Sequence, residues 1–165
     1  MAIAPRIEAH LQRVGVHYNL IEHPRSKTSI QSARSAQLPP TQVAKAVIAH
    51  DGDKYCMCVL PANRRLVLDW LNQRMHGRYR LATETEISAL FDDCEPGAVP
   101  PLGQVYGMPV IWDDELNDVQ DIYLESGDHE HLIHLDHGAF LELMGLQAHD
   151  IISCMQGESS GNTVH

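Results

Sequence analysis

The sequence has 165 residues, of which 44% are hydrophobic and 21% charged, and its formal net charge is −10. This length and composition are typical of one globular domain with its own core, and the negative charge argues against a general nucleic-acid-binding protein. No stretch approaches the roughly 18 apolar residues of a membrane-spanning helix. The N-terminal residues also lack the apolar segment of a secretory signal, so we expect a cytoplasmic location and no membrane partner.

The first elements alternate between helical and extended patterns. Residues 6–14 carry one apolar helical face, which Gly15 ends, and Val16–Glu22 has the pattern of a short strand. Thr28-Ser29-Ile30-Gln31 has the form of a capping box and predicts a helix that continues through Ala36.

The clearest local signal is a β-hairpin. Val43–His50 and Lys54–Leu60 are β-rich and are joined around Asp51-Gly52, a strong turn dipeptide. Leu66–Leu71 has a helical pattern, and a second capping box, Thr83–Glu86, predicts a helix through Phe91.

The second half is dominated by short strands. Cys94–Gly107 is rich in Gly and Pro and predicts a loop. Strands are expected at Met108–Trp112, Asp121–Glu125 and His131–Leu135, followed by a helical turn at Phe140–Met144. We therefore expect a mixed α/β single domain over residues 1–155 with one central sheet, and a disordered polar tail at 156–165.

Lys45 lies within the apolar strand Val43–His50, between the small residues Ala44 and Ala46. An ammonium group in such a strand costs free energy to bury unless it meets an anion or lone pairs. A position in a cleft explains it, and so does a lysine that protects an edge strand from aggregation.

Two glycine-containing loops are further candidates. In Gly97-Ala98-Val99-Pro100-Pro101, Gly permits close backbone approach and Pro stiffens the loop, so its N–H groups could stabilise an oxyanion. Gly127-Asp128-His129 offers a histidine that could position a substrate or act as a base near neutral pH. An ordinary turn and a solvent-exposed histidine are the alternatives.

The cluster of histidines at residues 129–137 suggests a metal site as a further alternative. His129, His131, His134 and His137 lie within nine residues, but Ile133 stands where the metallo-β-lactamase pattern needs Asp, and the cysteines form no CxxC pair. On a strand, His129 and His131 would share one face and His134 would point to the other. We therefore predict no metal.

The basic residues are concentrated in the first half of the chain. All twelve Lys and Arg residues lie between Arg6 and Arg80, where five acids leave +7, whereas residues 81–165 carry seventeen acids and no Lys or Arg. One basic face could contact phosphate, and segregated surface charge is the alternative. The candidates for that face are Arg64, Arg65, Arg74, Arg78 and Arg80.

The order and context of the Lys45 strand, the Gly97–Pro101 loop and Gly127-Asp128-His129 resemble the YbaK family, also called the prolyl-tRNA synthetase-associated editing domain. The resemblance covers about residues 6–146. It implies a mixed, partly barrel-like sheet flanked by helices and hydrolysis of amino acids wrongly attached to tRNA. For this chain it implies tRNA-Pro carrying alanine or another small residue, with a ribose hydroxyl assisting the water.

The resemblance also implies roles for individual residues. Gly97 would bind the carbonyl, Lys45 the terminal nucleotide, and His129 the aminoacyl group. No metal or organic cofactor is implied, and an aminoacyl-tRNA synthetase is a further candidate partner. Two rivals remain: a non-catalytic module that binds a nucleotide, tRNA or a synthetase in the same cleft, and a metal-dependent hydrolase. The remaining implied contacts are Ala98, Val99, Pro100, Pro101 and Gly127 for the substrate, and Arg64 and Arg65 for tRNA.

Overall fold

The computed structural model describes residues 2–156, so the predicted tail lies, apart from Gln156, outside the described residues. Among residues 2–156, no helix combines the length and the apolar composition needed to cross a membrane. The elements, in chain order, are α1 (Pro5–Val14), β1 (Asn19–Glu22), α2 (Ser29–Ser35), the 3₁₀ helix η1 (Pro40–Gln42), β2 (Val43–His50), β3 (Tyr55–Pro61), β4 (Arg64–Leu66), α3 (Leu68–Met75), β5 (Arg80–Leu81), α4 (Glu84–Leu90), η2 (Gly103–Tyr106), β6 (Val110–Asp113), η3 (Asp114–Asp118), β7 (Asp121–Glu125), β8 (His131–Asp136), α5 (His137–Met144), β9 (Ala148–Asp150) and β10 (Ser153–Met155).

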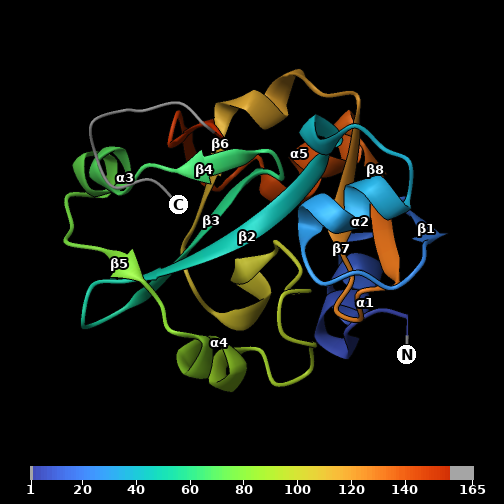
Figure 1. Ribbon diagram of the computed structural model, residues 1–165, viewed down its shortest axis with the longest axis horizontal. Helices are drawn as coiled ribbons and strands as arrows, with labels where there is room; N and C mark the ends of the chain where they lie inside the picture. Colours follow the sequence, from blue (N-terminus) through green and yellow to red (C-terminus); the bar gives the residue numbers. More distant parts are fainter. Residues whose placement is uncertain (1, 157–165) are drawn as a thin grey trace.

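A mixed eight-stranded sheet forms the centre of the molecule (Figure 1). Its order is β1-β8-β7-β2-β3-β6-β9, with the short β5 added beside β2, while β4 and β10 pair separately. β2 and β3 form the predicted antiparallel hairpin, but β2 pairs with β7, and β3 with β6, in parallel. The predicted mixed α/β fold with a central sheet flanked by helices is confirmed.

Local signals account for the helix boundaries. The Thr28 side chain accepts a hydrogen bond from the Gln31 amide at the start of α2, as predicted, but the Gln31 side chain accepts from the Lys27 amide instead of completing the box. At α4, Thr83 and Glu86 form both halves of the capping box. Such caps typically stabilise a helix by about 1 kcal/mol.

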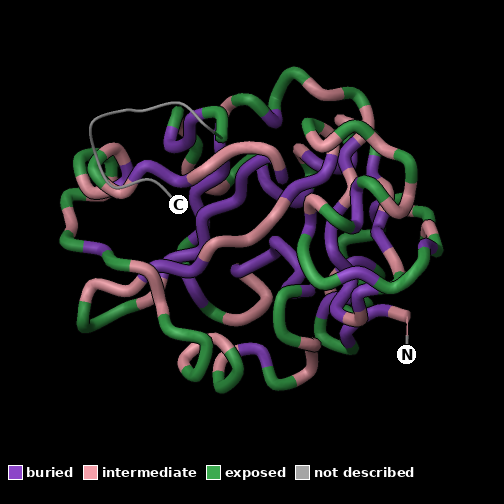
Figure 2. The backbone as a smooth tube through the Cα atoms, in the orientation of Figure 1, coloured by how far each residue is buried: buried purple, intermediate pink, exposed green. Residues whose placement is uncertain are grey.

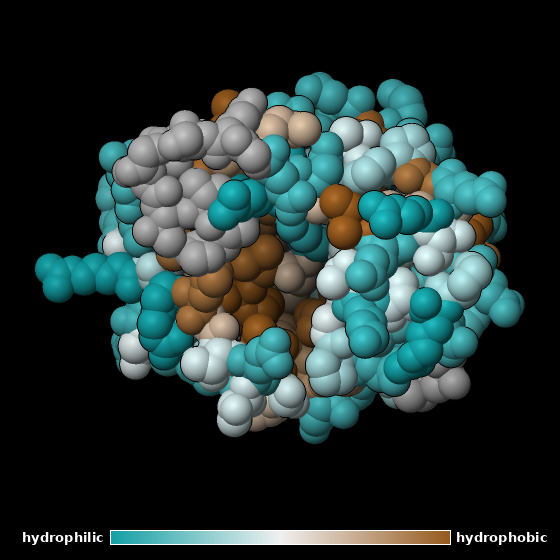
Figure 3. Space-filling model, viewed as in Figure 1, coloured by the Kyte–Doolittle hydropathy of each residue, from teal (hydrophilic) through white to brown (hydrophobic). Residues whose placement is uncertain are grey.

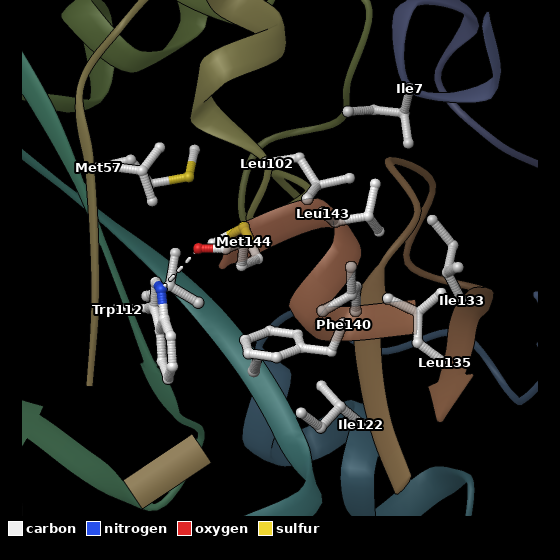
Figure 4. Packing of buried hydrophobic residues seen from close by; sticks show 14 of the residues in the cluster. Ile7, Met57, Leu102, Trp112, Ile122, Ile133, Leu135, Phe140, Leu143 and Met144 are labelled. Carbon is white, nitrogen blue, oxygen red and sulfur yellow. Dashed lines mark hydrogen bonds between the residues drawn. The ribbon is translucent and has the colours of Figure 1, made fainter. Parts of the chain in front are cut away.

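The larger hydrophobic core lies between the sheet, α1 and α5 (Figure 4). Trp112 of β6 meets Phe140 of α5 edge to face, with ring centroids 5.4 Å apart, and its indole Nε1–H donates to the Met144 carbonyl oxygen at 3.0 Å. Ile7 and Leu11, two of the three residues of the apolar face predicted for α1, are fully buried in the same core, whereas the third, Val14, is exposed. Burying each such side chain contributes about 1.5–3 kcal/mol.

The helix predicted at Leu66–Leu71 is wrong at its start. Leu66–Leu71 is not one helix: Leu66 ends strand β4, and α3 begins at Leu68. β4 exists because β10 returns from the far end of the chain to pair with it, which local pattern does not reveal. The strand predicted at His131–Leu135 is present as β8. His129 lies in the turn before it, at φ 64°, so it does not alternate with His131 along a strand.

The buried Asp113 fixes β10 in place. Its Oδ2 accepts hydrogen bonds from the Ile152 amide at 3.0 Å and the Ser153 hydroxyl at 2.7 Å. Arg64 then donates from Nε to the same hydroxyl oxygen at 2.8 Å and from its terminal nitrogen to the Ser153 carbonyl. A buried carboxylate with several donors is stable, so this network secures the end of the described chain.

Candidate active site

The candidate site lies along an open edge of β2. β7 pairs with β2 only at Val43 and Ala44, and β5 pairs only at Ala49 and His50. Within the described part of the chain, residues 45–47 therefore have a strand neighbour only on the β3 side, and this stretch is less buried than most of the strand (Figure 2). Figure 3 shows a hollow with apolar walls over β2 on this face of the molecule.

Two adjoining cavities open beside this edge and share Ile87 and Gly97. The outer one, of about 280 Å³, lies between α4 and the loop that contains Gly97. The inner one is smaller, about 90 Å³, or the space of roughly three water molecules. Its lining is apolar apart from one hydroxyl and consists of Ser29, Ala46, Ile48, Ile87, Gly97 and Val99.

Gly97 occupies a position that only glycine fits. Its φ is +84°, and a Cβ atom there would lie 2.7 Å from the Lys27 carbonyl oxygen and 3.1 Å from His129 Cε1. The backbone of Lys27 cannot move aside as a flexible side chain could, so any side chain at 97 must displace the loop. The loop thus brings backbone, rather than side chain, to the cavity wall.

The rest of the predicted loop is less available than the sequence suggested. Ala98, Pro100 and Pro101 are buried, and the Ala98 amide donates to the Glu95 carbonyl at 3.1 Å. The prolines have no N–H. Among the described residues, neither the Gly97 nor the Val99 amide has a backbone acceptor outside regular secondary structure, so these two are the loop's candidate oxyanion donors.

His129 supports the loop instead of facing the cavity. The residue is 5% exposed, and its ring Nε2 forms a hydrogen bond with the Pro96 carbonyl oxygen. Because a carbonyl oxygen only accepts, Nε2 carries the proton. The ring lies next to Gly97, where an added Cβ atom would be 3.1 Å from its Cε1 atom. The structure therefore brings His129 and Gly97 together, as the sequence suggested, with the histidine behind the loop.

Gly127 lies away from the Gly97 cavities. Its φ is +120°, and a Cβ there would lie 3.2 Å from the Ala4 side chain. It lines a different cavity of about 640 Å³ together with Cys94, Asp128 and other residues. Its carbonyl accepts from the Glu95 amide at 2.8 Å, so Gly127 connects the two loops structurally.

Lys45 lies on the other side of β2 from the inner cavity. Side chains alternate along a strand, and Ala46 and Ile48 line the cavity, so Lys45 faces away, toward β4. Burial, and secondarily the charge of Arg65, lower the pKa of Lys45 to about 8. Two neighbouring cations are stabilised when an anion binds beside both. The structure thus brings Lys45 together with Arg65 rather than with Gly97.

Arg64 and Arg65 are adjacent in sequence but not equivalent. The guanidinium of Arg64 is held by Ser153. Arg65 is half-buried, and its charge lies close enough to Lys45 to lower the pKa of the lysine. Of the other basic candidates, Arg74 pairs with Asp150 at 3.2 Å and Arg80 with Glu86 at 3.2 Å.

The remaining clustered histidines have separate partners. His131 bonds Asp128 at 2.6 Å, His134 bonds Asp121 at 2.8 Å, and His137 bonds Asn117 at 3.2 Å. Among residues 2–156, no group of three His, Cys, Asp or Glu side chains is arranged to hold a metal ion.

Two residues at the site were missed by the sequence analysis. Ser29, read only as part of a capping box, lies on the wall of the inner cavity. Glu125, the last residue of β7, is 1% exposed beside Ser29 and Ser32. No local signal marked Glu125. Alternation along β7 places it on the same face as Asp121 and Tyr123, where a polar, exposed side chain is expected.

Solved structures share this fold. A hypothetical protein, APE2540, is 19% identical with a TM-score of 0.80, covering 90% of this chain and 99% of its own. A crystal structure described as a proposed trans-editing enzyme for prolyl tRNA synthetase is 23% identical with a TM-score of 0.78, covering 90% and 96%. A proposed signal transduction protein from Marinobacter aquaeolei VT8 is 17% identical with a TM-score of 0.71, and the match covers 90% of this chain but 30% of that one.

No curated protein sequence matches the chain at a significant level. The sequence profile of the aminoacyl-tRNA editing domain, in contrast, matches residues 23–143. This range includes the open edge of β2, the Gly97 loop and every residue that lines the inner cavity. The chain therefore belongs to the aminoacyl-tRNA editing domain family.

Proposed function

We propose that this protein is a deacylase that removes alanine, or another small amino acid, from mischarged tRNA-Pro. The observation that carries the proposal is the small apolar cavity against Gly97, in a chain of the aminoacyl-tRNA editing family. The similar structure described as a trans-editing enzyme for prolyl tRNA synthetase supports the choice of tRNA.

In the proposed reaction, water adds to the ester carbonyl and the bond from the carbonyl carbon to the ribose oxygen breaks. The ribose oxygen takes up a proton, and the free amino acid leaves. The amides of Gly97 and Val99 would stabilise the oxyanion. None of the described residues that line the inner cavity is a general base, so we assign activation of the water to a ribose hydroxyl of the substrate.

The size of the inner cavity supports a small amino acid. Space for roughly three water molecules suits a small side chain such as a methyl group better than a large one. A synthetase active site discriminates against a smaller substrate by only about 1–3 kcal/mol per methylene. A separate hydrolytic site that admits only the smaller amino acid would correct such errors.

The cations at the open edge of β2 suit the nucleic-acid part of the substrate. The guanidinium charge of Arg65 lies close enough to Lys45 to lower the pKa of its ammonium group. A phosphate of the terminal nucleotide would offset both charges. In this arrangement the tRNA end lies across the edge of β2, with the aminoacyl group on the Gly97 side.

A panel of tRNA-Pro charged with alanine, serine, valine or proline tests the proposal. We expect rapid hydrolysis of the alanyl ester and slow hydrolysis of the valyl and prolyl esters, measured as release of labelled amino acid. Tight tRNA binding without hydrolysis of any ester would instead identify a non-catalytic binding module.

Replacing Ala46 with valine should fill the inner cavity. We expect Ala46→Val to lower kcat/KM for alanyl-tRNA by about tenfold or more, about 1.4 kcal/mol, since the added methyl groups would occupy the space of the substrate's methyl group. Affinity for uncharged tRNA and the melting temperature should change little. Val47→Ile, which adds one methylene on the opposite face of the same strand, is the matched control. Equal losses in the two variants would mean that Ala46 does not border the substrate.

Reversing the charge of Arg65 should weaken binding of tRNA. We expect Arg65→Glu to lower affinity and to flatten its salt dependence by about 0.7 logarithmic units of slope per lost phosphate contact. Small aminoacyl esters without the tRNA body should be hydrolysed as before. Lys54→Glu, the same charge reversal in the exposed β2–β3 turn, is the control. An unchanged salt slope in Arg65→Glu would remove Arg65 from the interface.

A further inference from the structure

Glu125 is a buried acid that the proposed reaction does not yet use. It ends β7, is 1% exposed, and burial raises its pKa to about 7. The hydroxyls of Ser32 and Ser29 oppose that rise, whereas the charge of Asp128 adds to it. Across residues 2–156, neither carboxyl oxygen has a hydrogen-bond partner of normal geometry. A buried carboxyl in this state is costly, so its presence calls for a ligand or a function.

Ser29 connects this carboxyl to the inner cavity. Its side chain lies beside Glu125 and also forms the one polar side chain on the cavity wall. Ser32, by contrast, is fully buried, and its hydroxyl is 2.7 Å from that of Ser26. When the Ser29 hydroxyl donates to the Glu125 carboxylate, only its oxygen lone pairs remain to face the cavity. The wall then presents an acceptor backed by a negative charge.

The groups that shift the pKa of Glu125 include two hydroxyls and another carboxyl, but no cation. The two cations Lys45 and Arg65 lie on the β4 side of β2, and neither is among the groups that shift the pKa of Glu125. A ligand that brought a positive charge to Ser29 would therefore supply what the protein lacks there.

We propose that Ser29 and Glu125 form the subsite for the α-ammonium group of the aminoacyl ester. The inference rests on the proposed function and deepens it. Around the Cα of a bound alanyl group, the ammonium would face Ser29, the methyl group would face Ala46 and Ile48, and the carbonyl would face Gly97. Glu125 acts through Ser29 and is a positioning residue, since its oxygens are buried behind the serine.

The test compares two esters of nearly the same size on tRNA-Pro, alanyl and lactyl, which differ in carrying an amine or a hydroxyl. We expect the wild-type protein to prefer the alanyl ester by about tenfold or more in kcat/KM, the usual effect of one hydrogen bond to a charged group. Glu125→Gln and Ser29→Ala should each lose much more activity on the alanyl ester than on the lactyl ester, so that most of this preference disappears. Ser29→Thr, which keeps the hydroxyl, should retain the preference.

Several results would overturn the subsite. Equal hydrolysis of both esters by the wild-type protein would do so, as would equal losses on both esters in the variants, which mark a purely structural role. If Glu125→Gln does not fold, Ser29→Ala decides alone. If the wild-type protein hydrolyses neither ester, the proposed function fails. Calorimetry with the non-hydrolysable alanylamide and lactylamide of adenosine then tests the subsite alone. Equal affinities for the two amides refute the subsite, and tighter binding of the alanylamide supports it.

Discussion

Replacing Lys45 with alanine is expected to reduce deacylation of alanyl-tRNA by about a hundredfold, a loss of about 2.7 kcal/mol in transition-state stabilisation. The Lys45 ammonium lies at the open edge of β2, where the charge of Arg65 helps to lower its pKa. We assign this ammonium to the terminal nucleotide. The fold should be retained, because removing a partly buried charge whose pKa is lowered relieves a desolvation cost. Single-turnover hydrolysis and thermal melting measure the two effects.

Two further measurements make the Lys45 prediction specific. The pKa of about 8 means that the ammonium is present below that pH, so the Lys45 contribution to activity should decline as pH rises through about 8. Lys45→Arg should recover little activity, because a planar guanidinium differs in shape from a compact ammonium. A folded Lys45→Ala protein that hydrolyses alanyl-tRNA at the wild-type rate would show that the nucleotide binds elsewhere.

Gly97→Ala should reduce activity by a comparable factor for a different reason. The new Cβ would lie 2.7 Å from the Lys27 carbonyl oxygen and in tight contact with the His129 ring. The left-handed backbone adds roughly 1–2 kcal/mol of strain for a residue with a side chain. We expect the loop to shift, the amides of Gly97 and Val99 to lose their alignment, and kcat to fall by about a hundredfold, as on loss of an oxyanion donor.

Gly107 provides the matched control for Gly97→Ala. Its φ is +76°, but a Cβ there would meet nothing within 4 Å. Gly107→Ala should therefore lower the melting temperature through backbone strain alone and leave kcat unchanged. If both variants lose activity equally, general destabilisation and not the geometry of the Gly97 loop limits the enzyme.

His129 illustrates how far sequence reasoning reached at this site. Its nearness to the Gly97 loop was expected, and the structure places the ring against that loop. The role beside the aminoacyl group came from the family resemblance alone and stays a prediction, whereas the turn that holds His129, at φ 64°, follows from the structure. The buried hydrogen bond to the Pro96 carbonyl makes His129 a support for the loop.

Lys45 shows the opposite case. Its place in an apolar strand was correctly predicted from the residues around it, and so was the hairpin that follows. Which face it takes relative to Gly97 depends on the packing of α4 and the Gly97 loop against β2. Sequence reasoning placed Lys45 and Gly97 in one cleft, whereas the inner cavity is lined by the next residue, Ala46.

The sequence by itself determined the helix caps and the β2–β3 hairpin, because each depends on residues within a few positions of one another. The need for glycine at position 97 depends on the Lys27 backbone, which only the tertiary structure brings beside it. Only the tertiary structure decided that Ser29 and Ala46 border one cavity, that Arg65 lies near Lys45, and that Glu125 is buried. These facts arise from the pairing of β2 with β7 and of β4 with β10, and from the packing of α2 on the sheet. Such contacts join residues tens of positions apart in the sequence, and local patterns of polarity do not reveal them.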